Sequence, residues 1–180
     1  MDSQGIIWVF STIFLCLLLH FPFEIEATSR NELLNDVCHQ SPDDKSCIKA
    51  LKSDPKISRV SNLKGLTNVA LGEAREESIA TKKFFISLKD SSDPKVKKAL
   101  KECAKYFGEA KSMLNLDGLE GDTASLDVHY ALDSCEQCEN ALKEANVHIG
   151  AIAPHIKRWK DSYNVAYAAV VATENSETIT

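Results

Sequence analysis

Six cysteines are the residues of this 180-residue chain that could most readily do chemistry. They are Cys16, Cys38, Cys47, Cys103, Cys135 and Cys138. Paired cysteines form disulfides, which persist in oxidising compartments outside the cytosol. A C-x-x-C motif such as Cys135 to Cys138 can also act in thiol redox chemistry or bind a metal ion. The spacing therefore raises three hypotheses: structural cross-links, a redox site and a metal site.

The C-x-x-C motif fits the redox and metal hypotheses poorly. Redox cysteines normally begin a helix, where the helix dipole lowers the thiol pKa, whereas Cys135 and Cys138 lie in the middle of a predicted helix. A zinc site requires four converging ligands, and neither Cys103 nor His129 completes such a set. We therefore expect one disulfide and one buried free thiol here, and no metal site.

Other side chains capable of acid–base chemistry form no catalytic set in the sequence. His39 adjoins Cys38, but a disulfide would remove the thiol of that pair. His148 and His155 are expected at solvated helix ends. A cluster of glutamates is typical of a solvated helix face; its members are Glu73, Glu76 and Glu77. Motifs of hydrolases, zinc proteases and phosphate loops are not present in the sequence, so we expect no enzyme and no cofactor.

The N-terminal residues resemble an export signal. Residues 6–19 form an apolar run with the length of a signal-peptide core, too short for a typical membrane span. We interpret residues 1–27 as a signal peptide cleaved after Ala27, with an uncleaved membrane anchor as the alternative. Residues 28–180 then form one mildly acidic domain that is expected outside the membrane. Without a clustered basic face, this domain is not typical of nucleic-acid-binding proteins.

Helical periodicity extends over almost all of the remaining chain and predicts an all-α fold. Breaks at Pro42 and at Ser53 to Pro55 predict a short N-terminal helical hairpin. Four longer helices follow, at about Ser58 to Leu88, Pro94 to Leu114, Asp122 to Ile149, and from Pro154 onward. Asp93 and Asp122 are expected to cap two of them. Short connections between long helices favour an antiparallel four-helix bundle.

The predicted helices place the cysteines in two groups. A bond between Cys38 and Cys47 would close the hairpin and contribute about 2.5–3 kcal/mol in the chain-entropy model. A turn centred on Gly121 puts Cys103 and Cys138 at the same height in antiparallel helices. A turn one residue earlier favours Cys135 instead, so helix heights favour Cys138 but leave this pairing open.

Several short motifs in their order together resemble one known family. They are Cys38 with Cys47, Leu51-x-Ser53-Asp54-Pro55, Leu63 to Leu66, Asp93-Pro94-Lys95, Cys103 with Phe107, Gly121-Asp122, and Ala131-Leu132 leading to Cys138-Glu139. The chain resembles the plant invertase and pectin methylesterase inhibitor family from about Asn31 to Thr173. The resemblance implies a four-helix bundle with an N-terminal hairpin and disulfides Cys38–Cys47 and Cys103–Cys138, with Cys135 as an extra free thiol.

The resemblance also implies a function. Such proteins are secreted, non-catalytic inhibitors that bind a carbohydrate enzyme of the cell wall (apoplast) or vacuole one-to-one and block its cleft. Invertase-directed relatives can carry Pro-Lys-Phe after the Gly-Asp turn, where this chain has Thr123-Ala124-Ser125. Pectin methylesterase is therefore the preferred partner and acid invertase the alternative. The turn residues Asp122, Thr123, Ala124 and Ser125 are expected to contact it.

Two rival functions come from other classes of protein. Phe85, Phe107 and Trp159 could line a cavity, which would make the bundle a carrier of apolar ligands. Buried aromatic residues are more often ordinary core residues. A storage protein without a partner is the other rival.

Overall fold

The computed structural model describes residues 30–88 and 92–177, and the predicted signal peptide lies outside this part. Residues 30–38 are helical. The further elements are α2 (Asp44–Ser53), η1 (Ile57–Arg59), α3 (Leu63–Ser87), α4 (Pro94–Met113), η2 (Leu119–Gly121), α5 (Ala124–Glu144) and α6 (Ile152–Glu177). The described ranges contain no strand and no helix apolar and long enough to cross a membrane.

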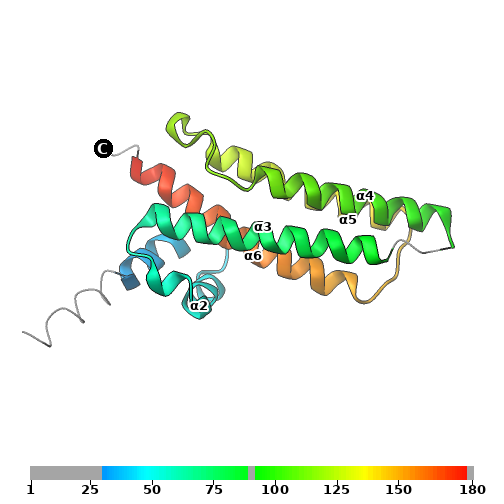
Figure 1. The fold of residues 1–180 in the computed structure, drawn as a ribbon, viewed down its shortest axis with the longest axis horizontal. Helices are drawn as coiled ribbons and strands as arrows, with labels where there is room; N and C mark the ends of the chain where they lie inside the picture. The colour runs from blue at the N-terminus through cyan, green and yellow to red at the C-terminus, as the bar shows by residue number, and fades with distance from the viewer. Residues whose placement is uncertain (1–29, 89–91, 178–180) are drawn as a thin grey trace, which may run out of the picture.

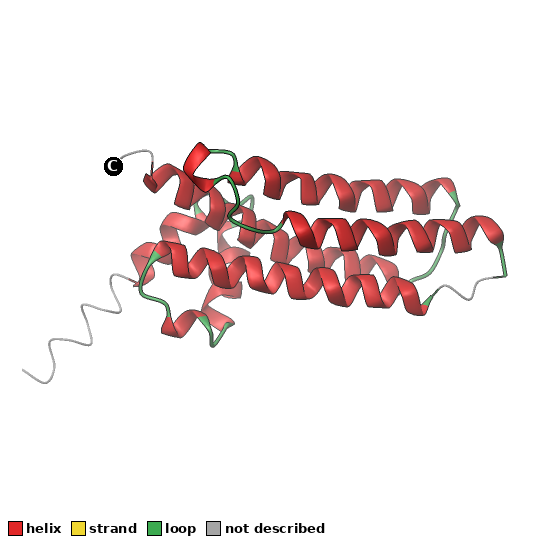
Figure 2. Ribbon diagram, turned by 45° about the horizontal axis from the view of Figure 1, so that its top comes forward, coloured by secondary structure: helices red, strands yellow, loops and turns green. Residues whose placement is uncertain are grey.

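The four long helices lie side by side as a bundle (Figures 1 and 2). Helix α4 packs against α3 and α5, and α6 packs against α3 and α5, so each helix touches two neighbours. The short N-terminal helices form a hairpin at one end of the bundle (Figure 1). The predicted all-α fold, with its hairpin extension and two disulfides, is confirmed.

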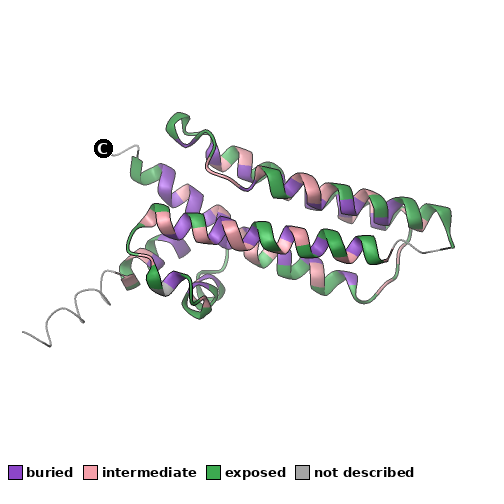
Figure 3. Cartoon of the chain, in the orientation of Figure 1, coloured by how far each residue is buried: buried purple, intermediate pink, exposed green. Residues whose placement is uncertain are grey.

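The inward faces of the helices form a continuous apolar core (Figure 3). Its centre is an aromatic cluster in which the Phe107 ring stacks on Phe85 at 5.6 Å and meets Trp159 edge to face at 5.4 Å, measured between ring centroids. All three side chains are fully buried. They pack against one another as ordinary core residues, which is the alternative to lining a cavity for an apolar ligand.

Several helix ends differ from the predicted ones. The third long helix ends at Glu144 rather than at Ile149, because the chain leaves the helix at Ala145 and Asn146 has a left-handed backbone with φ 52°. The first long helix begins at Leu63 rather than near Ser58, because the chain makes the turn η1 and then extends through Val60 and Asn62. The Asn62 side chain caps α3 by accepting a hydrogen bond of 2.7 Å from the Gly65 N–H. The last helix begins at Ile152, and Pro154 lies in its first turn, where a missing N–H is tolerated.

A polar residue of α3 is buried in the core near the middle of this helix. Ser78 is fully buried there and accepts a hydrogen bond of 2.7 Å from the Trp159 indole N–H of α6. Its hydroxyl in turn donates to the Ala74 carbonyl at 2.8 Å. The serine satisfies the one polar atom of the tryptophan, so a polar residue belongs at this core position.

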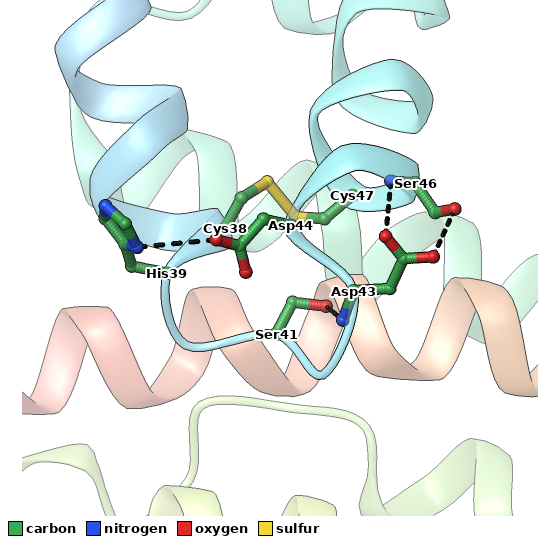
Figure 4. The surroundings of a disulfide bond; sticks show 7 residues. All are labelled: Cys38, His39, Ser41, Asp43, Asp44, Ser46 and Cys47. Carbon is green, nitrogen blue, oxygen red and sulfur yellow. Dashed lines mark hydrogen bonds and ion pairs between the residues drawn. A yellow bond between two sulfur atoms is a disulfide. The ribbon is translucent and has the colours of Figure 1, made fainter.

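The N-terminal hairpin is closed by the Cys38–Cys47 disulfide (Figure 4). Asp43 caps α2 by accepting a hydrogen bond of 3.0 Å from the Ser46 N–H. Lys56 then ties the following turn to α3 through ion pairs with Glu73 and Glu76. These two glutamates lie on the solvent-exposed face of α3, as expected, and they also hold Lys56 there.

Candidate functional site

The connection between α4 and α5, where partner contacts are predicted, has a well-defined backbone. Gly118 has a positive φ of 84° and its carbonyl accepts hydrogen bonds from Thr123, at 3.1 Å from the N–H and 3.3 Å from the hydroxyl. A Cβ atom on Gly118 would lie 2.3 Å from the Thr123 Oγ1. Leu119 is buried beneath the turn. Glycine is therefore needed here for both its backbone conformation and its small size.

Asp122 does not cap α5, so that prediction is wrong. Its backbone is left-handed, with φ 53° and ψ 35°, and its N–H donates to the Leu119 carbonyl at 3.2 Å. A capping residue has extended dihedral angles that aim its side chain at the first helical N–H groups. Thr123 occupies the cap position of α5 and makes no capping bond with its side chain.

The cap of α5 comes from another helix. Glu174 of α6 accepts a hydrogen bond of 2.8 Å from the Ser125 N–H, in the first turn of α5. The Glu174 residue is only 9% exposed. A carboxylate at a helix N-terminus is stabilised by the exposed N–H groups and the helix dipole. Helix α6 therefore fixes the position of the predicted contact segment.

Replacing Glu174 by glutamine is expected to lower the free energy of unfolding by about 1 kcal/mol, because a neutral amide caps a helix less well than a carboxylate. Urea unfolding measures the change, and hydrogen exchange at the Ser125 amide should speed up. Glu136→Gln, at an exposed position within α5, is the control and should change stability by less than about 0.5 kcal/mol. Equal effects of the two substitutions would contradict a capping role.

The four predicted contact residues differ in accessibility. Asp122 and Thr123 are exposed and Ser125 is half-buried, whereas Ala124 is fully buried and supports the segment from within. Contact through the Ala124 side chain would require the segment to open. Contact by the other three stays a prediction.

Two exposed apolar side chains on α5 adjoin this segment. Leu126 is 50% exposed and Tyr130 is 45% exposed, and they lie one helical turn apart. The sequence reasoning missed these two residues. The one sign of their exposure in the sequence was that they lie off the apolar seam of α5. We call Asp122, Thr123, Ser125, Leu126 and Tyr130 the turn surface.

The other three described cysteines form a disulfide and a buried free thiol. The second disulfide joins Cys103 of α4 to Cys138 of α5, with a Cα–Cα distance of 4.5 Å. Cys135 is a buried free thiol. Burial, together with the charge of Glu139, raises the pKa of Cys135 to about 12. A thiol in this state is a poor nucleophile at neutral pH.

The described histidines form no catalytic pair with a thiol. His39 adjoins Cys38, whose sulfur is in the disulfide, and the His39 ring nitrogen lies 3.5 Å from the Asp44 carboxylate (Figure 4). His129 is exposed, with its ring 6.0 Å from that of Tyr167. His148 is exposed and hydrogen-bonds the Asn146 side chain at 2.9 Å, as expected for a helix end. His155 was expected to be solvated, but it is half-buried and stacks on Phe84 at 3.8 Å. The described part of the chain brings no three metal-binding side chains together.

This architecture defines a class of small helical binding proteins, in which a cross-linked bundle presents a surface of fixed shape. Residues 32–173 match the family described as plant invertase/pectin methylesterase inhibitor, and the chain belongs to that family. It is accordingly an inhibitor and not an enzyme.

Individual relatives carry both kinds of inhibitor name. The chain is 29% identical over 149 residues to a pectinesterase inhibitor of Actinidia deliciosa, a match covering 74% of this chain and 78% of the relative. It is 31% identical over 134 residues to a putative invertase inhibitor of Platanus acerifolia, covering 71% and 73%. A cell wall/vacuolar inhibitor of fructosidase 2 from Arabidopsis thaliana is 27% identical over 118 residues, covering 62% and 65%.

Proposed function

We propose that this protein inhibits a pectin methylesterase of the plant cell wall by binding it one-to-one and covering its substrate groove. We further propose that residues 1–27 are a signal peptide and that residues 28–180 form the secreted inhibitor domain. Acid invertase of the cell wall or vacuole is the alternative target, because relatives with both names match the chain.

The preference for pectin methylesterase depends on the segment that follows the Gly121-Asp122 turn. Thr123 bonds back to Gly118, Ala124 is buried, and Ser125 is held by Glu174. In addition, residues 123–125 include no cationic or aromatic side chain, unlike the Pro-Lys-Phe that invertase-directed relatives can carry at this position. A surface of this kind is better suited to covering a broad groove than to inserting a peptide.

Preorganisation supports inhibition by steric occlusion. The disulfide Cys103–Cys138 joins the two helices on either side of the connection, and Glu174 holds the first turn of α5, so the surface is restrained before binding. A rigid surface loses less conformational entropy on association, so more of its contact energy appears as affinity. The exposed Tyr130 and Leu126 supply the kind of apolar contact area that dominates protein interfaces.

Titration of the purified secreted protein into pectin methylesterase and, separately, acid invertase tests the proposal. We expect pectin methylesterase activity to fall to zero at one equivalent of inhibitor, while invertase keeps its full rate. Loss of invertase activity alone would establish the alternative target. Full activity of both enzymes at micromolar inhibitor, at acidic and neutral pH, would refute the proposed function.

Replacing Tyr130 by alanine is expected to weaken inhibition about tenfold or more, because truncating a central aromatic contact typically costs over 1 kcal/mol of binding energy. The inhibition constant for pectin methylesterase is the measured quantity. Ile86→Ala is the matched control, since Ile86 is 43% exposed on α3, away from the turn surface. If the two variants inhibit equally well, the turn surface does not contact the enzyme.

A further inference from the structure

Charge is distributed unevenly over the bundle. Helix α4 carries six lysines and two glutamates, whereas α5 carries five acidic residues and one lysine. The expectation of no clustered basic face did not consider this difference between the helices. The net charge of the whole chain, −5, conceals this asymmetry.

The contact between α3 and α4 gathers basic side chains from both helices. Lys82 of α3 reaches across to α4 beside Gly108, where a Cβ atom would lie 3.1 Å from the Lys82 Nζ. Arg75 lies two helical turns from Lys82 and shares its side of α3. Lys97 and Lys101 share the side of α4 that carries Gly108, and Lys111 lies one turn beyond it. We call these five basic residues the basic strip.

All five residues of the basic strip are exposed, and their charges are not neutralised within the described part of the chain. Ion pairs on α4 join Lys98 to Glu102 at 3.7 Å and Lys105 to Glu109 at 3.3 Å, and these use both glutamates of the helix. No described acidic side chain pairs with Arg75, Lys82, Lys97, Lys101 or Lys111. The strip therefore presents a line of free positive charge.

The shape of the strip favours an extended partner. From Lys97 to Lys111 it follows the helix axis for about 21 Å, at about 1.5 Å per residue. Outward sides of α3 and α4 are exposed along this length (Figure 3). Lysines are depleted in protein–protein interfaces, which need a buried apolar centre. Among the described residues of α3 and α4, Ile86 is the one large apolar side chain that is exposed. This side of the bundle therefore lacks the apolar centre of a protein interface, and a linear polyanion fits it better.

We propose that the basic strip binds a linear polyuronate, the carboxylate polymer that pectin methylesterase produces. The choice of polymer rests on the proposed function: hydrolysis of each methyl ester adds water, breaks the ester C–O bond, and leaves methanol, a proton and one carboxylate on the chain. An inhibitor that binds these carboxylates is held where its target enzyme has already acted.

The basic strip and the turn surface lie on different sides of α4. The Ser134 hydroxyl of α5 lies 4.0 Å from the Met113 sulfur of α4. Tyr130 lies one helical turn before Ser134, so the turn surface is on the side of α4 that faces α5. Lys82 and Gly108 place the strip on the α3 side. Polymer and enzyme can therefore be bound at the same time.

Binding to two pectins that differ only in their methyl esters tests this proposal. We expect the purified secreted protein to bind polygalacturonate in low salt and to bind fully methyl-esterified pectin not at all. Raising NaCl from 50 to 500 mM should weaken binding strongly, because salt screens exposed charges. Equal binding to the two polymers, or binding that ignores salt, would overturn the proposal.

The triple substitution Lys97→Ala, Lys101→Ala and Lys111→Ala is expected to weaken polygalacturonate binding about tenfold, since each exposed charge contact contributes modestly. The control triple substitution Lys45→Ala, Lys49→Ala and Lys143→Ala removes the same charge from exposed positions elsewhere and should bind normally. Equal loss in both variants would show that only net charge matters, and the assignment to the strip would fail.

Enzyme inhibition by the same variants separates this proposal from the proposed function. We expect the strip variant to inhibit pectin methylesterase as well as the unmodified protein does. If it loses inhibition while the unmodified protein does not bind polygalacturonate, the strip contacts the enzyme and the polymer proposal is wrong. If no variant inhibits any enzyme, the proposed function fails, and the polymer measurement still decides whether the strip binds polyuronate.

Discussion

Replacing both Cys103 and Cys138 by alanine is expected to lower the free energy of unfolding by about 4 kcal/mol. The disulfide closes a loop of 35 residues that includes the whole α4–α5 connection, so its loss returns much conformational freedom to the unfolded chain. Both cysteines must be replaced, because a single change at Cys138 would leave Cys103 free to pair with Cys135. The turn surface, fixed between these helices, should lose affinity as well.

Urea unfolding of the oxidised protein measures this loss. The matched control is the pair Cys38→Ala and Cys47→Ala, which opens a shorter loop of 9 residues. The chain-entropy model gives it a smaller cost, about 2.5–3 kcal/mol. A larger loss from the hairpin pair than from the bundle pair would contradict the idea that the longer loop carries the greater stabilisation.

Replacing Phe107 by alanine is expected to cost about 3–5 kcal/mol of stability. Its ring is fully buried between Phe85 and Trp159, so truncation removes contacts on both sides and leaves a cavity that helices held by two disulfides close only in part. The adjacent Tyr106 is only half-buried on the same helix, and Tyr106→Ala should cost much less.

Thermal or urea unfolding of the Phe107→Ala and Tyr106→Ala variants compares their losses of stability directly. Equal costs would mean that Phe107 already borders open space, and the apolar-carrier function would then regain support. A second measurement, binding of a fluorescent fatty acid to the unmodified protein, should show no saturable site. The stabilities of the two variants and the binding of the fatty acid thus both distinguish a ligand carrier from an inhibitor.

The sequence was sufficient to predict most of the bundle, because its helices follow strong local rules. The regular seam of α4, with Leu100, Cys103 and Phe107, is buried as its spacing indicates. Asp93 followed by Pro94 marks the start of that helix, and the carboxylate caps it at 2.8 Å from the Lys95 N–H. Local periodicity and capping chemistry contain this information without help from the rest of the fold.

Features that depend on two distant segments could not be predicted in the same way. Ser78 is a core residue only because Trp159 needs an acceptor, and Glu174 caps α5 only because α6 ends beside it. Asp122 had the residue type of a cap but not the backbone conformation, which the preceding turn η2 determines. The basic strip likewise exists only once α3 and α4 lie in register.

The bond between Glu174 and Ser125 has a consequence for how the protein is made. The two residues are separated by 49 positions, and ribosomes add about 5–20 residues per second. The first turn of α5 therefore waits roughly 2–10 seconds for its carboxylate to be synthesised. A chain that ends before residue 174 would lack this carboxylate, so the first turn of α5 would have no acceptor from α6 for the Ser125 N–H.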